Sequence, residues 1–289
     1  MSHKQEAPPA WQAPAGACDA HFHVFGPKEK YPGSAARYEP PYAPLDDYLA
    51  LAKTMGFSRF VFVQPSAYGR DNSCMLDAMA QMDPKLVRGI VDIDENIADA
   101  ELAKLNAAGV RGVRINVSPI HKETPGLAES MIPRIQKMDA RCHEIGWHLD
   151  FLGPGWLTGA LMPTMKKMKC EFSVAHMGMY LAKDGVQQAG FQALLDMLRH
   201  GDGRCWVKFT GTYRMSEAPK FEGAQAMARA VIDACADRII WGSDYPHLSF
   251  ADKVGSVELF NLLGQWAPDD ATRRKILVEN PQKLFGFKD

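Results

Sequence analysis

Eight short runs of β-branched, aromatic and other apolar residues recur along the chain, separated by amphipathic segments with helical spacing. The runs cover residues 17–25, 59–65, 88–93, 110–117, 147–152, 171–176, 205–211 and 238–244. Strands that alternate with helices indicate parallel strands joined by helical crossovers. Eight such units in 289 residues match the count and size of a single (β/α)8 barrel, the TIM-barrel class of α/β fold. An open, doubly wound sheet is the alternative, but it would carry a glycine-rich turn after the first strand, where this chain has HFHVFGP.

The segments between the runs carry start and stop signals for helices. Residues 45–57 place apolar side chains on one face and end at Gly56. Residues 96–110 predict a helix that begins from a capping Asn96 and ends at Gly109.

The domain organisation is simple, because no internal repeat or linker interrupts the chain. We expect a flexible N-terminal arm over residues 1–16, which are polar and rich in Pro and Ala, and one barrel domain over residues 17–289. The arm lacks the apolar core of a signal peptide, and no apolar run approaches the length of a membrane span. The sequence therefore predicts a cytoplasmic protein without a membrane partner.

Charge and cysteine content narrow the function classes. Lys plus Arg number 33 and Asp plus Glu number 34, so the net charge of −1 lacks the basic excess of a nucleic-acid binder. The six cysteines are scattered, with no C-x-x-C pair, which predicts free thiols in a reducing compartment. The sequence leaves the oligomeric state open, a homo-oligomer included.

Polar side chains stand at the end of each predicted strand. They are His21 and His23, Gln64, Asp92 and Asp94, Arg114 and Asn116, Asp150, His176, Lys208 and Thr210, and Asp244. His21 and His23 are two apart, so a strand places both imidazoles on one face. Because the C-terminal ends of barrel strands carry the catalytic groups, we expect an active site there.

Several of these side chains also fit structural roles. Asp244 fits a helix cap, and Arg114 fits an ion pair with Asp92. Lys208 fits a salt bridge inside the barrel. His247 fits the rim of a site and the protein surface equally well.

Five segments in order along the chain resemble the amidohydrolase superfamily, and within it the branch that contains 2-pyrone-4,6-dicarboxylate lactonase. The segments are DAHFHVFGP, VQPSAYGRDN, RGVRIN, HMG and WGSDYPHL, and the resemblance spans residues 17–285. It implies a barrel fold and a lactone hydrolase of aromatic-compound catabolism that works without a metal.

A metal-independent lactone hydrolysis needs a base for water, polarisation of the carbonyl and anchors for the substrate. Asp244 is the candidate general base, and the resemblance implies that it also returns the proton as the ring opens. His21, His23 and His176 are the candidate hydrogen-bond donors to the carbonyl oxygen.

The candidate substrate-binding residues follow the same strands. Arg114 and Arg214 present planar guanidinium groups that suit carboxylates bidentately. The full set is Arg114, Arg214, Ser66, Tyr68, Asn116, Gln64 and His247. We therefore expect a small carboxylated lactone as the substrate.

The residue types argue against a metal cofactor. A binuclear site needs an anionic bridge at the end of the fourth strand, where this chain has Arg114 and Asn116. A zinc site needs about four ligands, and His21, His23 and Asp244 supply three. The alternatives are one zinc ion on these residues with His176, as in a decarboxylase of the same superfamily, and a catalytically inert barrel that binds organic anions.

The chain departs from the branch at two places. Ile120 stands where the resemblance implies a second basic residue, and Leu152 stands where it implies a tyrosine. The ring substituents can therefore differ, as in a sulfo- or carboxymuconolactone or a sugar-acid lactone, and an isomerase of sugar lactones is a variant of the same reading.

Overall fold

The structure, a computed structural model, describes residues 6–34 and 38–288. Its strands form one eight-stranded sheet in the order β1 to β8, and the strand pairings it describes are parallel. The strands are β1 (Cys18–Phe22), β2 (Arg59–Val63), β3 (Val87–Val91), β4 (Val110–Asn116), β5 (His148–Leu152), β6 (Phe172–Val174), β7 (Cys205–Phe209) and β8 (Ile239–Trp241). Helices separate the strands, which confirms the predicted (β/α)8 barrel.

Ten α-helices lie in the described part of the chain. They are α1 (Leu45–Met55), α2 (Ser73–Met79), α3 (Asp99–Ala107), α4 (Leu127–Ile145), α5 (Gly155–Met165), α6 (Ala189–His200), α7 (Ala224–Cys235), α8 (Ser256–Trp266), α9 (Asp270–Arg274) and α10 (Asn280–Phe285). Two compact units divide the chain: unit 1 contains residues 1–111 and 241–289, and unit 2 contains residues 112–240.

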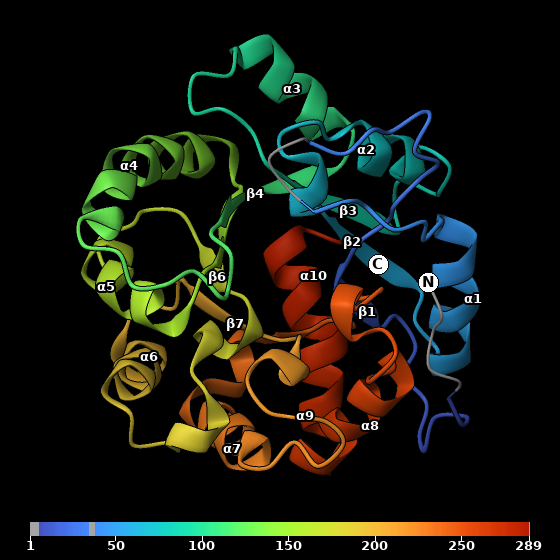
Figure 1. Ribbon diagram of the computed structural model, residues 1–289, viewed down its shortest axis with the longest axis vertical. Coiled ribbons are helices and arrows are strands. Elements are labelled where there is room, and N and C mark those ends of the chain that lie inside the picture. The colour runs from blue at the N-terminus through green and yellow to red at the C-terminus, as the bar shows by residue number, and fades with distance from the viewer. Residues whose placement is uncertain (1–5, 35–37, 289) are drawn as a thin grey trace. The chain divides into compact units, whose positions relative to one another are not determined.

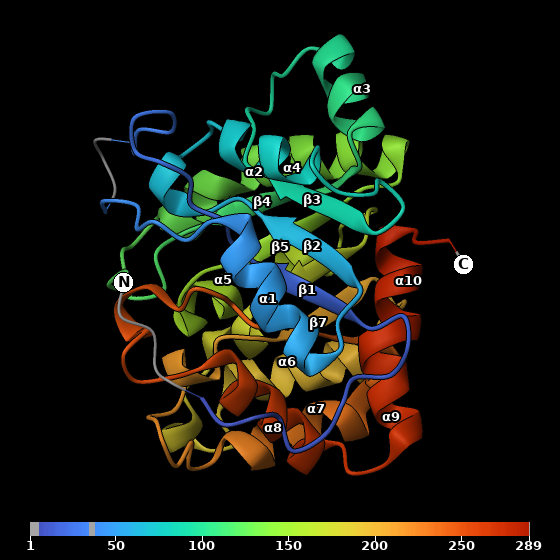
Figure 2. The same ribbon diagram turned by 90° about the vertical axis from the view of Figure 1, so that its right-hand side faces the viewer.

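Unit 1 joins the first three strands to the last helices of the chain. The Arg88 side chain on β3 donates hydrogen bonds to the carbonyl oxygens of Phe285 and Gly286, at the C-terminal end of α10. A π-helical turn, Lys275–Glu279, connects α9 to α10 as one column (Figure 2). Residues 6–16 are part of this unit, and within them the Trp11 ring stacks on Phe260 of α8 at 4.0 Å between centroids.

Unit 2 holds β5 to β7, and most of β4, against a row of helices. The helices α4, α5, α6 and α7 follow one another side by side along these strands (Figure 1). All residues of β5 and β7 are buried, as the apolar runs predict for strands covered on both faces.

The turn signals in the sequence were partly correct. Gly56 ends α1 in the left-handed region with φ 91°, as predicted. The predicted cap at Asn96 is wrong, since α3 begins at Asp99 after Ala98. The Asn96 backbone and side-chain nitrogens instead donate to Asp94 Oδ1, so this residue closes a local turn.

The cysteines are free thiols, as predicted, and five of the six are buried. Within residues 6–34 and 38–288, no helix has the length and apolar character needed to cross a membrane.

Candidate active site

His21, near the end of β1, and His23, just after it, face the same carboxylate in unit 1. Asp244 Oδ1 lies 3.4 Å from His21 Nε2 and 3.5 Å from His23 Nε2. The imidazole centroids are 5.1 Å apart, and their planes meet at 82°. All three side chains are buried. The sequence prediction that His21 and His23 share one face is therefore confirmed, and Asp244 lies against that face.

The backbone around Asp244 explains how this cluster forms. The Asp244 N–H donates to the His21 carbonyl at 2.8 Å, and the His23 N–H donates to the Tyr245 carbonyl at 2.9 Å. Gly242 lies so close to β1 that a Cβ there would approach the His21 backbone nitrogen to 2.5 Å. Asp244 itself adopts a left-handed conformation, with φ 57°, which Asp tolerates better than most residues.

The hydrogen bond of His23 fixes the position of one proton. His23 Nδ1 lies 2.7 Å from the Val63 carbonyl oxygen, which can only accept. Nδ1 therefore carries the proton, and Nε2 of the neutral ring offers its lone pair toward Asp244. His23 Nε2 donates a hydrogen bond only in the imidazolium form.

Two alternatives for the loop after β8 are resolved. The next helical turn begins at Leu248, four residues after Asp244, so the helix-cap reading of Asp244 is wrong. His247 is buried, and its Nε2 lies 3.0 Å from the hydroxyl oxygen of Ser256, the first residue of α8. His247 thus joins the loop to α8 and is not a surface residue.

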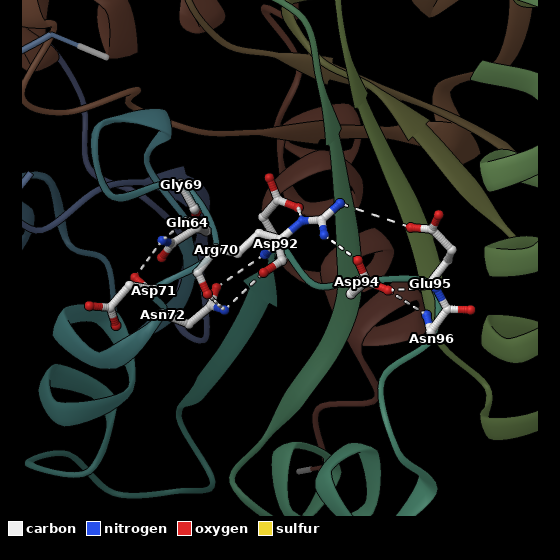
Figure 3. Close-up of polar contacts among 9 residues, drawn as sticks. All are labelled: Gln64, Gly69, Arg70, Asp71, Asn72, Asp92, Asp94, Glu95 and Asn96. Carbon is white, nitrogen blue, oxygen red and sulfur yellow. Dashed lines mark hydrogen bonds and ion pairs between the residues drawn. The ribbon is translucent and has the colours of Figure 1, made fainter. Parts of the chain in front are cut away.

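Gln64 holds the loop that carries Ser66 and Tyr68. Its Nε2 donates to the carbonyl oxygens of Gly69 and Asp71 at 3.0 and 2.8 Å (Figure 3). Ser66 is half-buried. Tyr68 is buried, and burial raises the pKa of its hydroxyl group, so it remains protonated at neutral pH.

An arginine that the sequence analysis did not single out connects the loops after β2 and β3. Arg70 forms ion pairs with Asp92, Asp94 and Glu95 (Figure 3). The signal was present as an arginine in YGRDN and a run of acids in DIDEN. Asp92 therefore has Arg70 as a partner, and Arg70 is engaged by carboxylates of the protein itself.

Unit 2 contains a buried ion pair. Lys208 Nζ lies 2.8 Å from Asp150 Oδ1, and both side chains are fully buried. The Ser173 hydroxyl donates to the same oxygen at 2.6 Å. Burial alone would raise the pKa of Asp150, but the charges of Lys208 and Arg114 outweigh it and lower the pKa to about 2. The structural reading of Lys208 as a salt-bridge residue is confirmed.

His176 is oriented by the end of β7. Its Nδ1 lies 2.5 Å from the Thr210 hydroxyl oxygen. The neighbouring Gly211 has φ 54°, and a Cβ there would approach His176 Nδ1 to 2.5 Å, so only glycine fits. His176 and Met177 also have positive φ values, 51° and 48°, which turn the chain sharply after β6.

The candidate anchors of unit 2 differ in exposure. Arg114 on β4 is buried, whereas Arg214 is half-buried with its guanidinium 5.1 Å from the Tyr213 ring centroid. Within the described residues, the buried Asn116 Oδ1 has no hydrogen-bond partner. Ile120, at one of the two departures from the family pattern, is 90% exposed.

The cluster in unit 1 also has donor atoms that suit a metal ion. Single ligand atoms of His21, His23 and Asp244 all lie within 4.8 Å of one another. Two imidazole nitrogens and one carboxylate oxygen are a suitable partial donor set for zinc, which takes about four ligands. The residues therefore fit a cation but supply three of its ligands.

A (β/α)8 barrel with His-x-His at the end of its first strand and an Asp after its eighth strand, facing both imidazoles, defines an amidohydrolase-type enzyme. Residues 18–287 match the family model described as amidohydrolase, so the chain belongs to the amidohydrolase family.

Among the relatives and solved structures that this chain resembles are hydrolases of lactones. The 4-sulfomuconolactone hydrolase of Rhizobium radiobacter is 36% identical over 290 residues, which cover 98% of this chain and 94% of that protein. The 2-pyrone-4,6-dicarboxylate hydrolase of Comamonas testosteroni is 32% identical over 289 residues, covering 96% of this chain and 92% of that protein. A probable 2-pyrone-4,6-dicarboxylic acid hydrolase from Acinetobacter baumannii, with citric acid bound, superposes with a TM-score of 0.82 at 26% identity, covering 94% of this chain and all of that one.

Proposed function

We propose that the protein is a lactone hydrolase that opens the ring of a carboxylated lactone without a metal ion, using Asp244 as the general base. The observation that carries this proposal is the buried carboxylate of Asp244 within 3.5 Å of two imidazole nitrogens. The relatives support the reaction class, since two of them are named as hydrolases of anionic lactones.

The hydrolysis needs two proton transfers at one carboxylate. Asp244 removes a proton from water as the water oxygen bonds to the lactone carbonyl carbon. The tetrahedral intermediate then collapses, the ring C–O bond breaks, and Asp244 returns the proton to the departing ring oxygen. No other reactant is required, and Asp244 ends in its starting state.

The imidazoles stabilise the negative charge that develops on the carbonyl oxygen. One such donor contributes about 2.7–4 kcal/mol in comparable oxyanion sites. His23 carries a proton on Nδ1, so His21 is the better neutral donor and His23 donates as an imidazolium. We assign His176 to the same step on the fold class, because catalytic side chains of these barrels come from the ends of several strands.

The substrate carboxylates are assigned to arginine side chains. Arg114 and Arg214 offer bidentate guanidinium groups, and Arg70 is excluded because three carboxylates of the protein engage it. Ser66, Tyr68 and Asn116 add hydrogen bonds to the substrate in this proposal. The Acinetobacter baumannii structure holds citric acid, a tricarboxylate, which supports a carboxylated ligand in this proposal.

Gln64 and His247 receive a different role from the one that the sequence suggested. The Gln64 amide group donates to two loop carbonyls, and His247 bonds to Ser256. We propose that these two residues position the loops that contact the substrate and do not touch it directly.

A zinc-dependent decarboxylase is the second candidate, favoured by the ligand geometry of His21, His23 and Asp244. A zinc ion held by these residues would supply Lewis acidity for the reacting carboxylate. Zinc content discriminates the two candidates.

The test is a screen of purified protein with 2-pyrone-4,6-dicarboxylate, 4-sulfomuconolactone and sugar-acid lactones. Ultraviolet absorbance follows the loss of conjugation in the unsaturated lactones, and proton NMR separates ring opening from isomerisation. We expect ring opening of at least one carboxylated or sulfonated lactone by protein that holds far less than one zinc ion per chain, because the proposed proton transfers at Asp244 use no metal. One equivalent of zinc, with activity abolished by a chelator, or binding of every lactone without turnover, contradicts the proposal.

A further inference from the structure

The turn that carries Asp244 is held by a second carboxylate that no step of the proposed mechanism uses. Asp19 on β1 is fully buried. Its Oδ1 accepts the backbone N–H of Ser243 at 3.0 Å and the backbone N–H of His21 at 3.1 Å. One oxygen atom of Asp19 therefore holds the backbone of Ser243, the residue before Asp244, and the backbone of His21.

The second oxygen of Asp19 is also engaged. The Tyr48 hydroxyl of α1 donates to Asp19 Oδ2 at 2.9 Å, and the Tyr48 ring stacks on Phe22 at 3.7 Å between centroids. Because both oxygens have donors and the tyrosine is fixed by stacking, the Asp19 carboxylate has one orientation.

The geometry of the cluster requires such a support. Asp244 has φ 57°, a sparsely populated conformation that persists only where surrounding contacts determine it. The neighbouring bonds, Asp244 N–H to the His21 carbonyl and His23 N–H to the Tyr245 carbonyl, hold β1 and residues 243–245 in register. Without the Asp19 bond, the Ser243 N–H would be left buried without its carboxylate acceptor, and the turn would relax.

We propose that Asp19 is a positioning residue that sets the distance between Asp244 and the imidazoles of His21 and His23. It acts through two backbone N–H groups and touches no reacting atom. The effect on rate rests on the proposed function, whereas the effect on the turn does not. Asp19 stands in DAHFH two residues before His21 and accepts the His21 N–H, a local contact that Asp side chains often make two residues on, so this spacing is the sequence signal for it.

The test compares variants that remove or keep the acceptor. Asp19→Ala removes the two backbone hydrogen bonds and the one from the Tyr48 hydroxyl. Asp19→Asn keeps a carbonyl oxygen, and the Tyr48 hydroxyl can accept from its amide group. We expect Asp19→Ala to lower kcat about 100-fold, with KM changed less than about threefold, because a displacement of about 1 Å has this effect on a positioned group. We expect Asp19→Asn to keep kcat within about fivefold of the wild type.

Unit 2 offers a matched control. Asp139 on α4 also accepts two backbone N–H groups with one oxygen, those of Lys169 and Cys170, both at 2.8 Å. The segment that Asp139 binds, Lys169 and Cys170, lies just before the start of β6, away from the C-terminal ends of the strands. Asp139→Ala therefore removes the same kind of support, and we expect lower stability with unchanged kcat.

A loss of kcat in Asp19→Ala no larger than in Asp139→Ala would overturn the proposal. If Asp19→Ala is not recovered folded, Asp19→Asn is used in its place. A loss of kcat as large as about 100-fold in Asp19→Asn contradicts positioning by the acceptor oxygen.

Amide hydrogen exchange tests the turn without any substrate. We expect faster exchange at Ser243 and Asp244 in Asp19→Ala and wild-type exchange in Asp19→Asn. Wild-type protein inactive on every lactone would refute the proposed function alone, and unchanged exchange in Asp19→Ala would refute the positioning role alone.

Discussion

Two buried polar clusters in this chain have opposite character. In unit 2, Asp150 binds Lys208 at 2.8 Å and Ser173 at 2.6 Å, so its charge is neutralised at close range. In unit 1, Asp244 stands 3.4 and 3.5 Å from two imidazoles, beyond the usual length of a strong charge-assisted hydrogen bond. The first arrangement stabilises a fold. The second leaves a carboxylate able to take a proton, and we interpret it as the chemical site.

The largest effect that tests this difference between the two carboxylates is expected from neutralising Asp244. Asp244→Asn keeps the shape of the side chain but cannot accept a proton from water, so we expect kcat to fall about 10³-fold, within the usual contribution of a general base. Thermal unfolding should show a folded protein. Asp92→Asn makes the same change at the end of β3, where Asp92 pairs with Arg70, and should leave kcat near the wild-type value. Equal losses in both variants would contradict the role of Asp244.

The second prediction concerns removal of the Asp150–Lys208 ion pair. Lys208→Met leaves Asp150 as a buried charge without its lysine partner, and we expect the free energy of unfolding to fall by about 3–5 kcal/mol. Urea unfolding measures this loss. The double variant Asp150→Leu/Lys208→Met removes both charges and should recover most of the stability. A Lys208→Met protein as stable as the wild type would show that the pair is not structural.

The pH dependence of stability follows from the same pair. The pKa of Asp150 is lowered from 3.8 to about 2 in the folded chain. Its ionisation therefore adds stability that is fully present above about pH 4 and is lost as the pH falls to about 2, on the order of 2 kcal/mol. Urea unfolding of the double variant Asp150→Leu/Lys208→Met between pH 4 and pH 2 should show a shallower decline than the wild type. Parallel curves would contradict the assignment.

A smaller effect is expected at the anchor for the substrate. Arg114→Met removes a guanidinium group but keeps an unbranched apolar side chain, and KM for carboxylated lactones should rise about 10–100-fold, the value of a hydrogen bond between charged groups. The uncharged lactone of the same ring should show little change in KM. An unchanged KM for the carboxylated substrate would remove Arg114 from the proposed site.

The sequence was most informative where a pattern has one structural meaning. The alternation of eight apolar runs with amphipathic segments predicted the barrel, and the spacing of His21 and His23 predicted their common face. Both results follow from the periods of strands and helices, which are local properties of the chain.

The sequence was least informative where the hydrogen-bond partner of a polar side chain depends on the conformation of a loop. The partners of Gln64 and His247 lie only five to nine residues away in the chain, but residue types alone do not show which side chain meets which loop group. Asn96 likewise fits a helix cap and a turn with Asp94, and only the structure distinguishes the two. The left-handed conformation of Asp244 likewise depends on contacts with β1, more than 200 residues away in the chain.

The most direct test of metal-independent catalysis at Asp244 is a measurement of turnover and metal content on one sample. The protein is dialysed against a chelator, its zinc is quantified by mass spectrometry, and its hydrolysis of 2-pyrone-4,6-dicarboxylate and 4-sulfomuconolactone is followed before and after zinc is added back. Our account predicts full turnover of one of these lactones in the zinc-free protein and no gain on adding zinc. Activity that disappears with the metal and returns with one equivalent of zinc would contradict it.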